Sequence, residues 1–178
     1  MTTASGSNTS TALRILILCT GNSARSQIAE ALLNYKGKGR FHAESAGSVP
    51  AREVNPLAID TLRRHGVPWS GHPPRSMDGL ERERWDFVIT VCDQAREACP
   101  IFPGQPILAH WGMEDPAAAA GSDEDKRRAF NDAFVTLSRR IELFLALSME
   151  KLERLVLEAR VKAIGGAAPP RAASRPGL

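Results

Sequence analysis

Short apolar runs alternate with amphipathic segments along this chain, a pattern typical of strands that are each followed by a helix. The apolar runs predict buried strands over residues 14–18, 40–44, 86–91 and 106–109. Segments with helical periodicity predict helices over residues 26–35, from 56 to about 66, and from 122 onward. Because strands and helices alternate, we expect an α/β fold with a parallel sheet that carries helices on both faces.

The longest predicted helix begins near Ser122 and has the clearest apolar stripe. Its large apolar residues recur at steps of three or four: Phe130, Phe134, Leu137, Ile141 and Leu145. The same periodicity continues through Leu152 and Leu155 until Gly165-Gly166 ends it.

Length and composition fit a globular protein with one sizeable core. Of the 178 residues, 43% are hydrophobic and 24% are charged. We expect the folded domain to span residues 13–150, followed over 151–178 by a helical extension and a basic Pro/Ala-rich tail. Residues 1–12 are rich in Ser and Thr, which predicts a disordered leader rather than a secretory signal.

The net charge of +3 does not favour a nucleic-acid partner, because much of it lies near the C-terminus. Residues 151–178 contain six of the 23 basic residues and only two acidic ones, and basic tails are usually solvated. No apolar run approaches the ~20 residues that a membrane span requires, so we expect no membrane association. Only three cysteines are present, which predicts a reducing, cytoplasmic location. We expect a monomer.

One stretch carries the candidate chemistry: Cys19-Thr20-Gly21-Asn22-Ser23-Ala24-Arg25-Ser26. It joins the first predicted strand to the first predicted helix, so backbone amides and the helix dipole favour a bound tetrahedral oxyanion. The same field is expected to hold Cys19 as a nucleophilic thiolate. Arg25 presents a planar guanidinium that can pair with two oxygens of the anion. We interpret residues 20–26 as an oxyanion loop and Cys19 as catalytic, although many strand-end cysteines are inert core residues.

Three polar side chains of this loop have supporting roles in that interpretation. Ser23 and Ser26 can donate hydrogen bonds to the Cys19 sulfur or to the bound anion. Asn22 is expected to stabilise the loop, in a left-handed conformation that asparagine tolerates.

The residues from Cys19 to Glu30, CTGNSARSQIAE, resemble the signature of the arsenate reductases built on the low-molecular-weight tyrosine phosphatase fold. Further features recur in the order that this family shows: Ser45-Ala46-Gly47, the pair Cys92 and Cys99, and His110-Trp111-Gly112 ahead of Asp115-Pro116. The resemblance extends from about residue 14 to about residue 147. It implies a three-layer αβα architecture with a four-stranded parallel sheet of order 2-1-3-4, and arsenate or another tetrahedral oxyanion as substrate.

The resemblance also assigns roles to three residues outside the loop. Asp115 matches the family's general acid, which protonates the oxygen that leaves arsenate; taken alone, Asp-Pro is also a common turn. Cys92 and Cys99 match two thiols of a cascade in which Cys19 attacks arsenic, Cys92 attacks Cys19 and Cys99 attacks Cys92. A thioredoxin-like reductant then restores the thiols, with a glutathione/glutaredoxin couple as the open alternative. Without the resemblance, Cys92 and Cys99 would be a buried and a surface cysteine, and their spacing is poor for a metal site.

Two other functions share parts of this pattern. A low-molecular-weight protein tyrosine phosphatase would use the same loop and acid, with water completing the cycle. Aromatic residues around the site would favour it, and Tyr35 is the only tyrosine. A non-catalytic oxyanion-binding or regulatory module is disfavoured by the intact set of Cys19, Arg25 and Asp115.

We expect no cofactor or metal beyond an external thiol reductant. Some members of the family bind potassium beside the loop, through residues matching Asn22, Glu30 and Ser45 together with a carboxylate. Arg75 stands at the place of that carboxylate. A guanidinium there repels a cation and can pair with Glu30 instead, which argues against potassium dependence. The remaining histidines have no partner evident in the sequence and are interpreted as surface residues: His42, His65 and His72.

Overall fold

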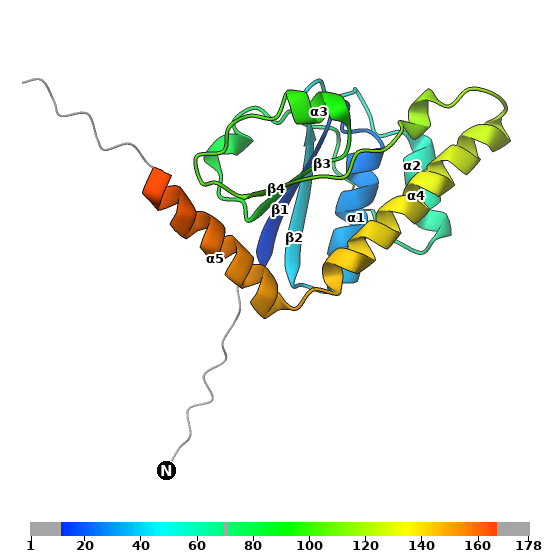
Figure 1. Ribbon diagram of the computed structural model, residues 1–178. Coiled ribbons are helices and arrows are strands. Elements are labelled where there is room, and N and C mark those ends of the chain that lie inside the picture. Colours follow the sequence, from blue (N-terminus) through cyan, green and yellow to red (C-terminus); the bar gives the residue numbers. More distant parts are fainter. Residues whose placement is uncertain (1–11, 70, 167–178) are drawn as a thin grey trace, which may run out of the picture.

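A four-stranded parallel sheet forms the centre of the protein (Figure 1). The computed structural model describes residues 12–69 and 71–166, so the expected C-terminal tail and nearly all of the expected leader lie outside the described residues. The strands are β1 Leu13–Cys19, β2 Phe41–Gly47, β3 Phe87–Thr90 and β4 Ile107–His110. They pair in parallel in the order β2-β1-β3-β4, which confirms the expected topology.

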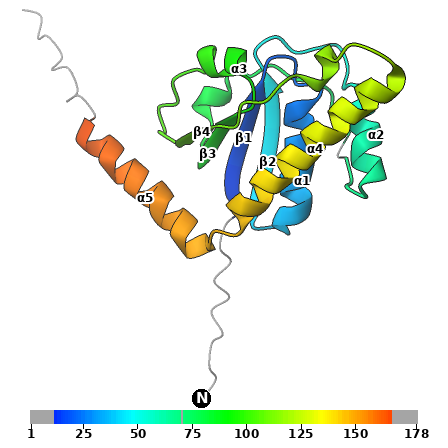
Figure 2. The same cartoon turned by 45° about the vertical axis from the view of Figure 1, so that its right-hand side comes forward.

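Helices lie on both sides of this sheet and complete the expected three layers. The α-helices are α1 Arg25–Gly37, α2 Pro56–Arg64, α3 Asp93–Glu97, α4 Asp123–Leu145 and α5 Met149–Gly166. Two short 3-10 helices, η1 Leu80–Arg82 and η2 Pro116–Ala118, lie in the connections. Helices α1, α2 and α4 lie on one side of the sheet, and α3 and α5 on the other (Figures 1 and 2).

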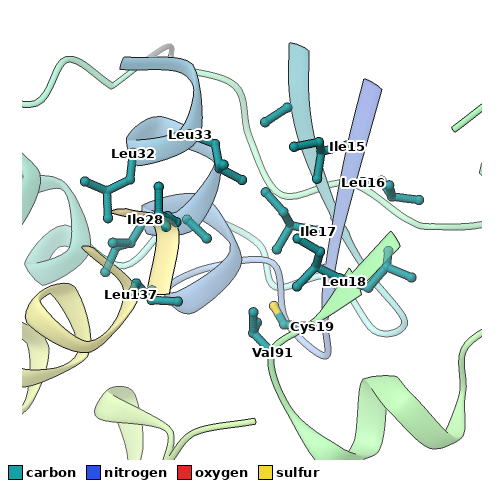
Figure 3. Close-up of a cluster of buried hydrophobic side chains, with 14 of the residues drawn as sticks. Ile15, Leu16, Ile17, Leu18, Cys19, Ile28, Leu32, Leu33, Val91 and Leu137 are labelled. Carbon is teal, nitrogen blue, oxygen red and sulfur yellow. The ribbon is translucent and has the colours of Figure 1, made fainter. Parts of the chain in front are cut away.

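The central strand β1 is the most buried part of the molecule. Ile15, Leu16, Ile17 and Leu18 are all fully buried. Because successive side chains of a strand point to opposite faces, such a continuous apolar run requires cover on both sides. Figure 3 shows this core, in which side chains of α1 and α4 lie on one side of β1, and Cys19 lies at its lower end.

The strands extend further toward the site than the hydrophobic pattern indicates. The predicted strand ends at residues 18 and 44, whereas β1 and β2 pair as far as Cys19 opposite Gly47. Backbone hydrogen bonding continues where the side chains turn polar or small, so a pattern of apolar residues cannot mark these ends. The helix starts were better predicted. Asn55 caps α2 by accepting from the Leu57 amide, and Ser122 caps α4 in a capping box with Asp125.

The apolar periodicity that continues past Leu145 does not belong to one helix. The chain turns at residues 146–148, and the Ser148 hydroxyl accepts from the Lys151 amide at the start of α5. Leu152 and Val156 are buried there, whereas Leu155 faces outward. Arg160 of this helix forms an ion pair with Asp86, so part of the C-terminal basic charge holds α5 against the body of the protein. Within the described residues, no helix combines the length and the apolar character needed to cross a membrane.

Candidate active site

The loop after β1 folds around the sulfur of Cys19, which is buried. Asn22 adopts a left-handed conformation with φ of 50°, and this turn brings its amide to 3.1 Å from Cys19 Sγ. The Ser26 hydroxyl lies 2.9 Å from the same sulfur. Ala24 precedes α1 without a side-chain cap, which leaves amides of the first helical turn available to an anion.

The segment over residues 48–55 fixes the direction in which the loop's peptide groups point. Its amides donate to four loop carbonyls: Ser48 to Cys19 at 3.1 Å, Val49 to Thr20 at 3.0 Å, Ala51 to Gly21 at 2.8 Å and Asn55 to Ser23 at 2.8 Å. Carbonyl oxygens that are held outward in this way cannot repel an anion in the loop. The close approach also requires glycine at position 47, because a Cβ there would lie 2.3 Å from the Thr20 carbonyl oxygen.

The Asn22 side chain ties the loop to the rest of the fold. Its Nδ2 donates to Ser26 Oγ and to Ser45 Oγ, each at 2.9 Å, and its Oδ1 accepts from the Arg75 amide at 3.0 Å. The side chain is fully buried. Asn22 therefore acts as a scaffold residue and contacts elements that lie far apart in the sequence.

The surroundings of Cys19 act on its thiol in opposite directions. Burial raises the pKa of the Cys19 thiol, whereas hydrogen bonds from the Ser26 hydroxyl and the Asn22 amide lower it. The net direction is upward, contrary to the expectation that the loop alone holds a thiolate. The loop buries the sulfur as well as directing donors at it, and the sequence pattern reveals only the donors.

Arg25 and Asp115 lie together at the mouth of the loop. Arg25 Nη1 donates to the Met113 carbonyl at 2.9 Å, and Nη2 lies 3.4 Å from Asp115 Oδ2. The other oxygen of Asp115 accepts from the Ala117 amide at 3.1 Å, so this residue also caps the turn that Asp-Pro suggests. Asp115 is thus half-exposed and lies beside the loop arginine.

The remaining two cysteines flank α3. Cys92 precedes the helix and is buried; its Sγ accepts from the Ala95 amide at 3.4 Å and lies 3.4 Å from Thr20 Oγ1. Cys92 is therefore beside the oxyanion loop. Cys99 follows the helix and lines a cavity of about 200 Å³ with Thr90 and His110. Burial raises the pKa of the Cys99 thiol, and all three cysteines are free thiols.

The prediction that three histidines are surface residues is confirmed for His42 and His65, which are exposed, whereas His72 is partly buried. All three have partners that the sequence analysis did not identify. His72 Nε2 lies 2.9 and 2.8 Å from the two carboxylate oxygens of the buried Glu30. His65 stacks on Phe134 with ring centroids 3.9 Å apart, and the exposed His42 lies 3.2 Å from Glu44. The partners of His65 and His72 are distant in sequence, so no local signal could have indicated them, whereas Glu44 is only two residues from His42 on the same strand.

The residues at the place of the family's potassium site do not fit a cation. Both oxygens of Glu30 face His72, and one also accepts from the Ser45 hydroxyl. Arg75 does not pair with Glu30, as the sequence suggested; it donates to the Ser45 carbonyl at 2.9 Å and pairs with Glu44 at 2.7 Å. Glu30 thus already has its donors, and a guanidinium takes the place of the fourth ligand. In the described part of the chain, no cluster of three or more His, Cys, Asp or Glu residues could hold a metal ion.

The fold and the loop together define a protein with a cysteine and an arginine in one oxyanion site at the end of a parallel strand. Residues 14–156 match the family model described as low molecular weight phosphotyrosine protein phosphatase. The chain therefore belongs to this family.

Three relatives show which members of the family it is similar to. An arsenate reductase from Halalkalibacterium halodurans is 35% identical over 130 residues, which cover 73% of this chain and 93% of that protein. A solved arsenate reductase in a phosphate-binding state has a TM-score of 0.64 at 27% identity and covers 75% of this chain and 97% of its own. A thioredoxin-dependent arsenate reductase from Corynebacterium glutamicum has a TM-score of 0.57 at 29% identity, covering 76% of this chain and 64% of its own.

Replacing Ser26 by alanine should raise the pKa of the Cys19 thiol further, because the variant loses a hydroxyl donor to the sulfur. In a Cys92→Ser/Cys99→Ser background, alkylation of Cys19 by iodoacetamide at neutral pH should slow about five- to tenfold, and its pH midpoint should move upward. Ser23→Ala is the matched control, since within the described residues its hydroxyl makes no hydrogen bond to Cys19. An unchanged midpoint in Ser26→Ala would contradict this role.

Proposed function

We propose that this protein is an arsenate reductase, which converts arsenate to arsenite with electrons from its own thiols. The observation that carries the proposal is the position of Cys92, whose sulfur lies 3.4 Å from the hydroxyl of Thr20, the residue after the nucleophile. A phosphatase has no need of a second buried thiol beside its oxyanion loop. A reductase needs one there to attack the first.

The reaction begins with binding of arsenate by the loop amides and Arg25. Cys19 loses its proton and its sulfur attacks arsenic, while Asp115 gives a proton to the departing oxygen, which leaves as water. One S–As bond forms and one As–O bond breaks. No electrons have yet been transferred to arsenic.

Reduction takes place when Cys92 attacks Cys19. The new S–S bond replaces the S–As bond, whose electron pair stays on arsenic and gives arsenite. Cys99 then attacks Cys92, and Cys19 leaves as a thiolate. An external dithiol, of which a thioredoxin-like protein is the favoured type, reduces the Cys92–Cys99 disulfide and supplies the two electrons of the cycle.

The geometry sets a requirement for the third step. Cys92 and Cys99 stand at opposite ends of α3, and a disulfide needs their Cα atoms within ~7 Å. Helix α3 must therefore unwind or shift, and Cys99 must lose its proton as it does so. The new disulfide would then lie at the surface, where a reductant can reach it. Three free thiols with this role are consistent with a reducing compartment such as the cytoplasm.

Hydrolysis of phosphotyrosine is the alternative that the same loop and acid support. Such a substrate favours aromatic side chains around the mouth of the loop. Tyr35 is near the far end of α1 and does not serve this purpose, because the loop is at the helix start. A purely regulatory oxyanion module is less well supported, since it has no use for an acid at Asp115.

The proposed activity can be tested by following arsenate-dependent NADPH oxidation with thioredoxin and thioredoxin reductase, beside the glutathione/glutaredoxin couple. Cys19→Ser should abolish the activity, because a serine hydroxyl stays protonated where a thiolate can form. Hydrolysis of an aryl phosphate by the wild type, measured in parallel, reports the alternative function. Arsenite production by Cys19→Ser would overturn the assignment.

Variants that lack one of the three thiols should stop the reaction at different steps. Cys92→Ser should stop turnover within the protein, whereas Cys99→Ser should complete one round and retain a Cys19–Cys92 disulfide. The wild type, given arsenate without reductant, should accumulate Cys92–Cys99. Peptide mapping after alkylation identifies each species. If Cys92 and Cys99 are both freely alkylated after one turnover, the cascade is wrong, and an external thiol or hydrolysis must complete the reaction.

Activity should not depend on potassium, because His72 and Arg75 stand where a cation would need ligands. Replacing potassium chloride by sodium chloride at constant ionic strength should leave kcat and the KM for arsenate unchanged. Choline chloride controls for effects common to both alkali cations. Severalfold activation by potassium alone would contradict this expectation.

A further inference from the structure

The segment that carries Asp115 has little regular structure of its own. Residues 111–115 connect β4 to η2, and the hydrogen bond from the Trp111 amide to the Thr90 carbonyl, at 2.7 Å, links only the start of this segment to the sheet. The position of the Asp115 carboxylate therefore depends on contacts made by the preceding residues. We call residues 111–115 the acid segment.

Arg140 of α4 binds two successive carbonyls of the acid segment. Its Nη1 donates to the Trp111 carbonyl at 2.6 Å and to the Gly112 carbonyl at 3.2 Å, and Nη2 donates to the Gly112 carbonyl at 3.2 Å. Within the residues that the structure describes, this guanidinium forms no ion pair with a carboxylate. In the described part of the chain its hydrogen bonds all go to main-chain carbonyls, which is the arrangement of a group that fixes a backbone.

Other contacts hold the same segment from different sides. The Trp111 ring packs against Phe144 of α4 with centroids 6.1 Å apart. Gly112 lies so close to His110 that a Cβ at position 112 would be 2.5 Å from its Nε2. Arg25 holds the next carbonyl, that of Met113, at 2.9 Å. Two guanidinium groups, one from α4 and one from the oxyanion loop, thus bind consecutive carbonyls ahead of Asp115.

We propose that Arg140 is a positioning residue for the general acid. It holds the start of the acid segment through Trp111 and Gly112, so that Asp115 stays beside Arg25 when that guanidinium turns to the substrate. The proposal rests on the proposed function, because it acts through the acid role of Asp115. It assigns α4, which lies along the oxyanion-loop helix α1 (Figures 1 and 2), a part in catalysis beyond packing.

The chemistry of the contact requires arginine. A planar guanidinium presents several N–H donors in a fixed fork and can reach two carbonyls at once, whereas a lysine ammonium is a point charge on a flexible stem. Methionine keeps much of the apolar stem and removes every donor. Arg140→Met therefore tests whether the hydrogen bonds matter, and Arg140→Lys tests whether the planar arrangement of donors on a guanidinium is needed.

The experiment measures the single-turnover rate of arsenite formation, with enzyme in excess over arsenate and at an enzyme concentration that saturates binding. Arg140→Met should lower this rate about tenfold, because a small displacement of the acid from the leaving oxygen is costly. Phosphate should inhibit the variant at unchanged concentrations, since the oxyanion loop is intact. Arg140→Lys should recover part of the rate. Arg139→Met, the same change at an exposed neighbour on α4, is the matched control and should have no effect.

The decisive comparison uses Asp115→Asn, which should lower the rate by ~10²–10⁴ through loss of the proton donor. If Arg140 acts through Asp115, then Arg140→Met should cause no further loss in that background. The same tenfold loss in both backgrounds would overturn this proposal and leave the acid role standing. A normal rate for Asp115→Asn would overturn both. If Arg140→Met fails to fold by circular dichroism, Arg140→Lys carries the same comparison.

Discussion

The outward direction of the loop carbonyls is the constraint on which the site depends. Four backbone hydrogen bonds from residues 48–55 hold these carbonyls away from the place of an anion. They form because β2 pairs with β1 as far as Gly47 opposite Cys19, where the two backbones approach too closely for any side chain. The oxyanion loop is therefore a consequence of strand pairing. The pairing of β1 with β2 sets the backbone of this loop, and Cys19 and Arg25 provide its reactive and charged side chains.

Burial and hydrogen bonding act in opposite directions on the pKa of the Cys19 thiol. The core around β1 also buries Cys19, and this burial raises the pKa of its thiol. Hydrogen bonds from Ser26 and Asn22 to the sulfur lower the same pKa. Asn22 also contacts Ser45, whose hydroxyl donates to Glu30, and Glu30 faces His72. A chain of polar contacts thus extends from the sulfur to the surface. Asn22, Ser45 and Glu30 match residues of the family's potassium site, but here the carboxylate of Glu30 faces the Ser45 hydroxyl and the ring of His72.

The groups that the proposed reaction uses in turn come from elements that differ in burial and length. Cys19 lies at the end of a fully buried strand, whereas Cys92 precedes a helix of only five residues. Asp115 lies in a segment that depends on arginine side chains from α1 and α4. This division suits a reaction in which the oxyanion stays in place while thiols exchange around it. The third step of the proposed reaction requires this short helix to rearrange.

The sequence by itself determined the alternating α/β order, the oxyanion loop and the helix starts near residues 56 and 122, because these depend on neighbours within a few residues. The strand order and the roles of Cys92, Cys99 and Asp115 were expected from resemblance to a family. Only the tertiary structure decided the partners of His72 and Arg75, the separate helix α5 and the hold of Arg140 on the acid segment. Long-range contacts between polar side chains leave no periodic pattern in the sequence. The pKa of the Cys19 thiol depends on how far elements that are distant in sequence bury the sulfur, and this too has no local signal.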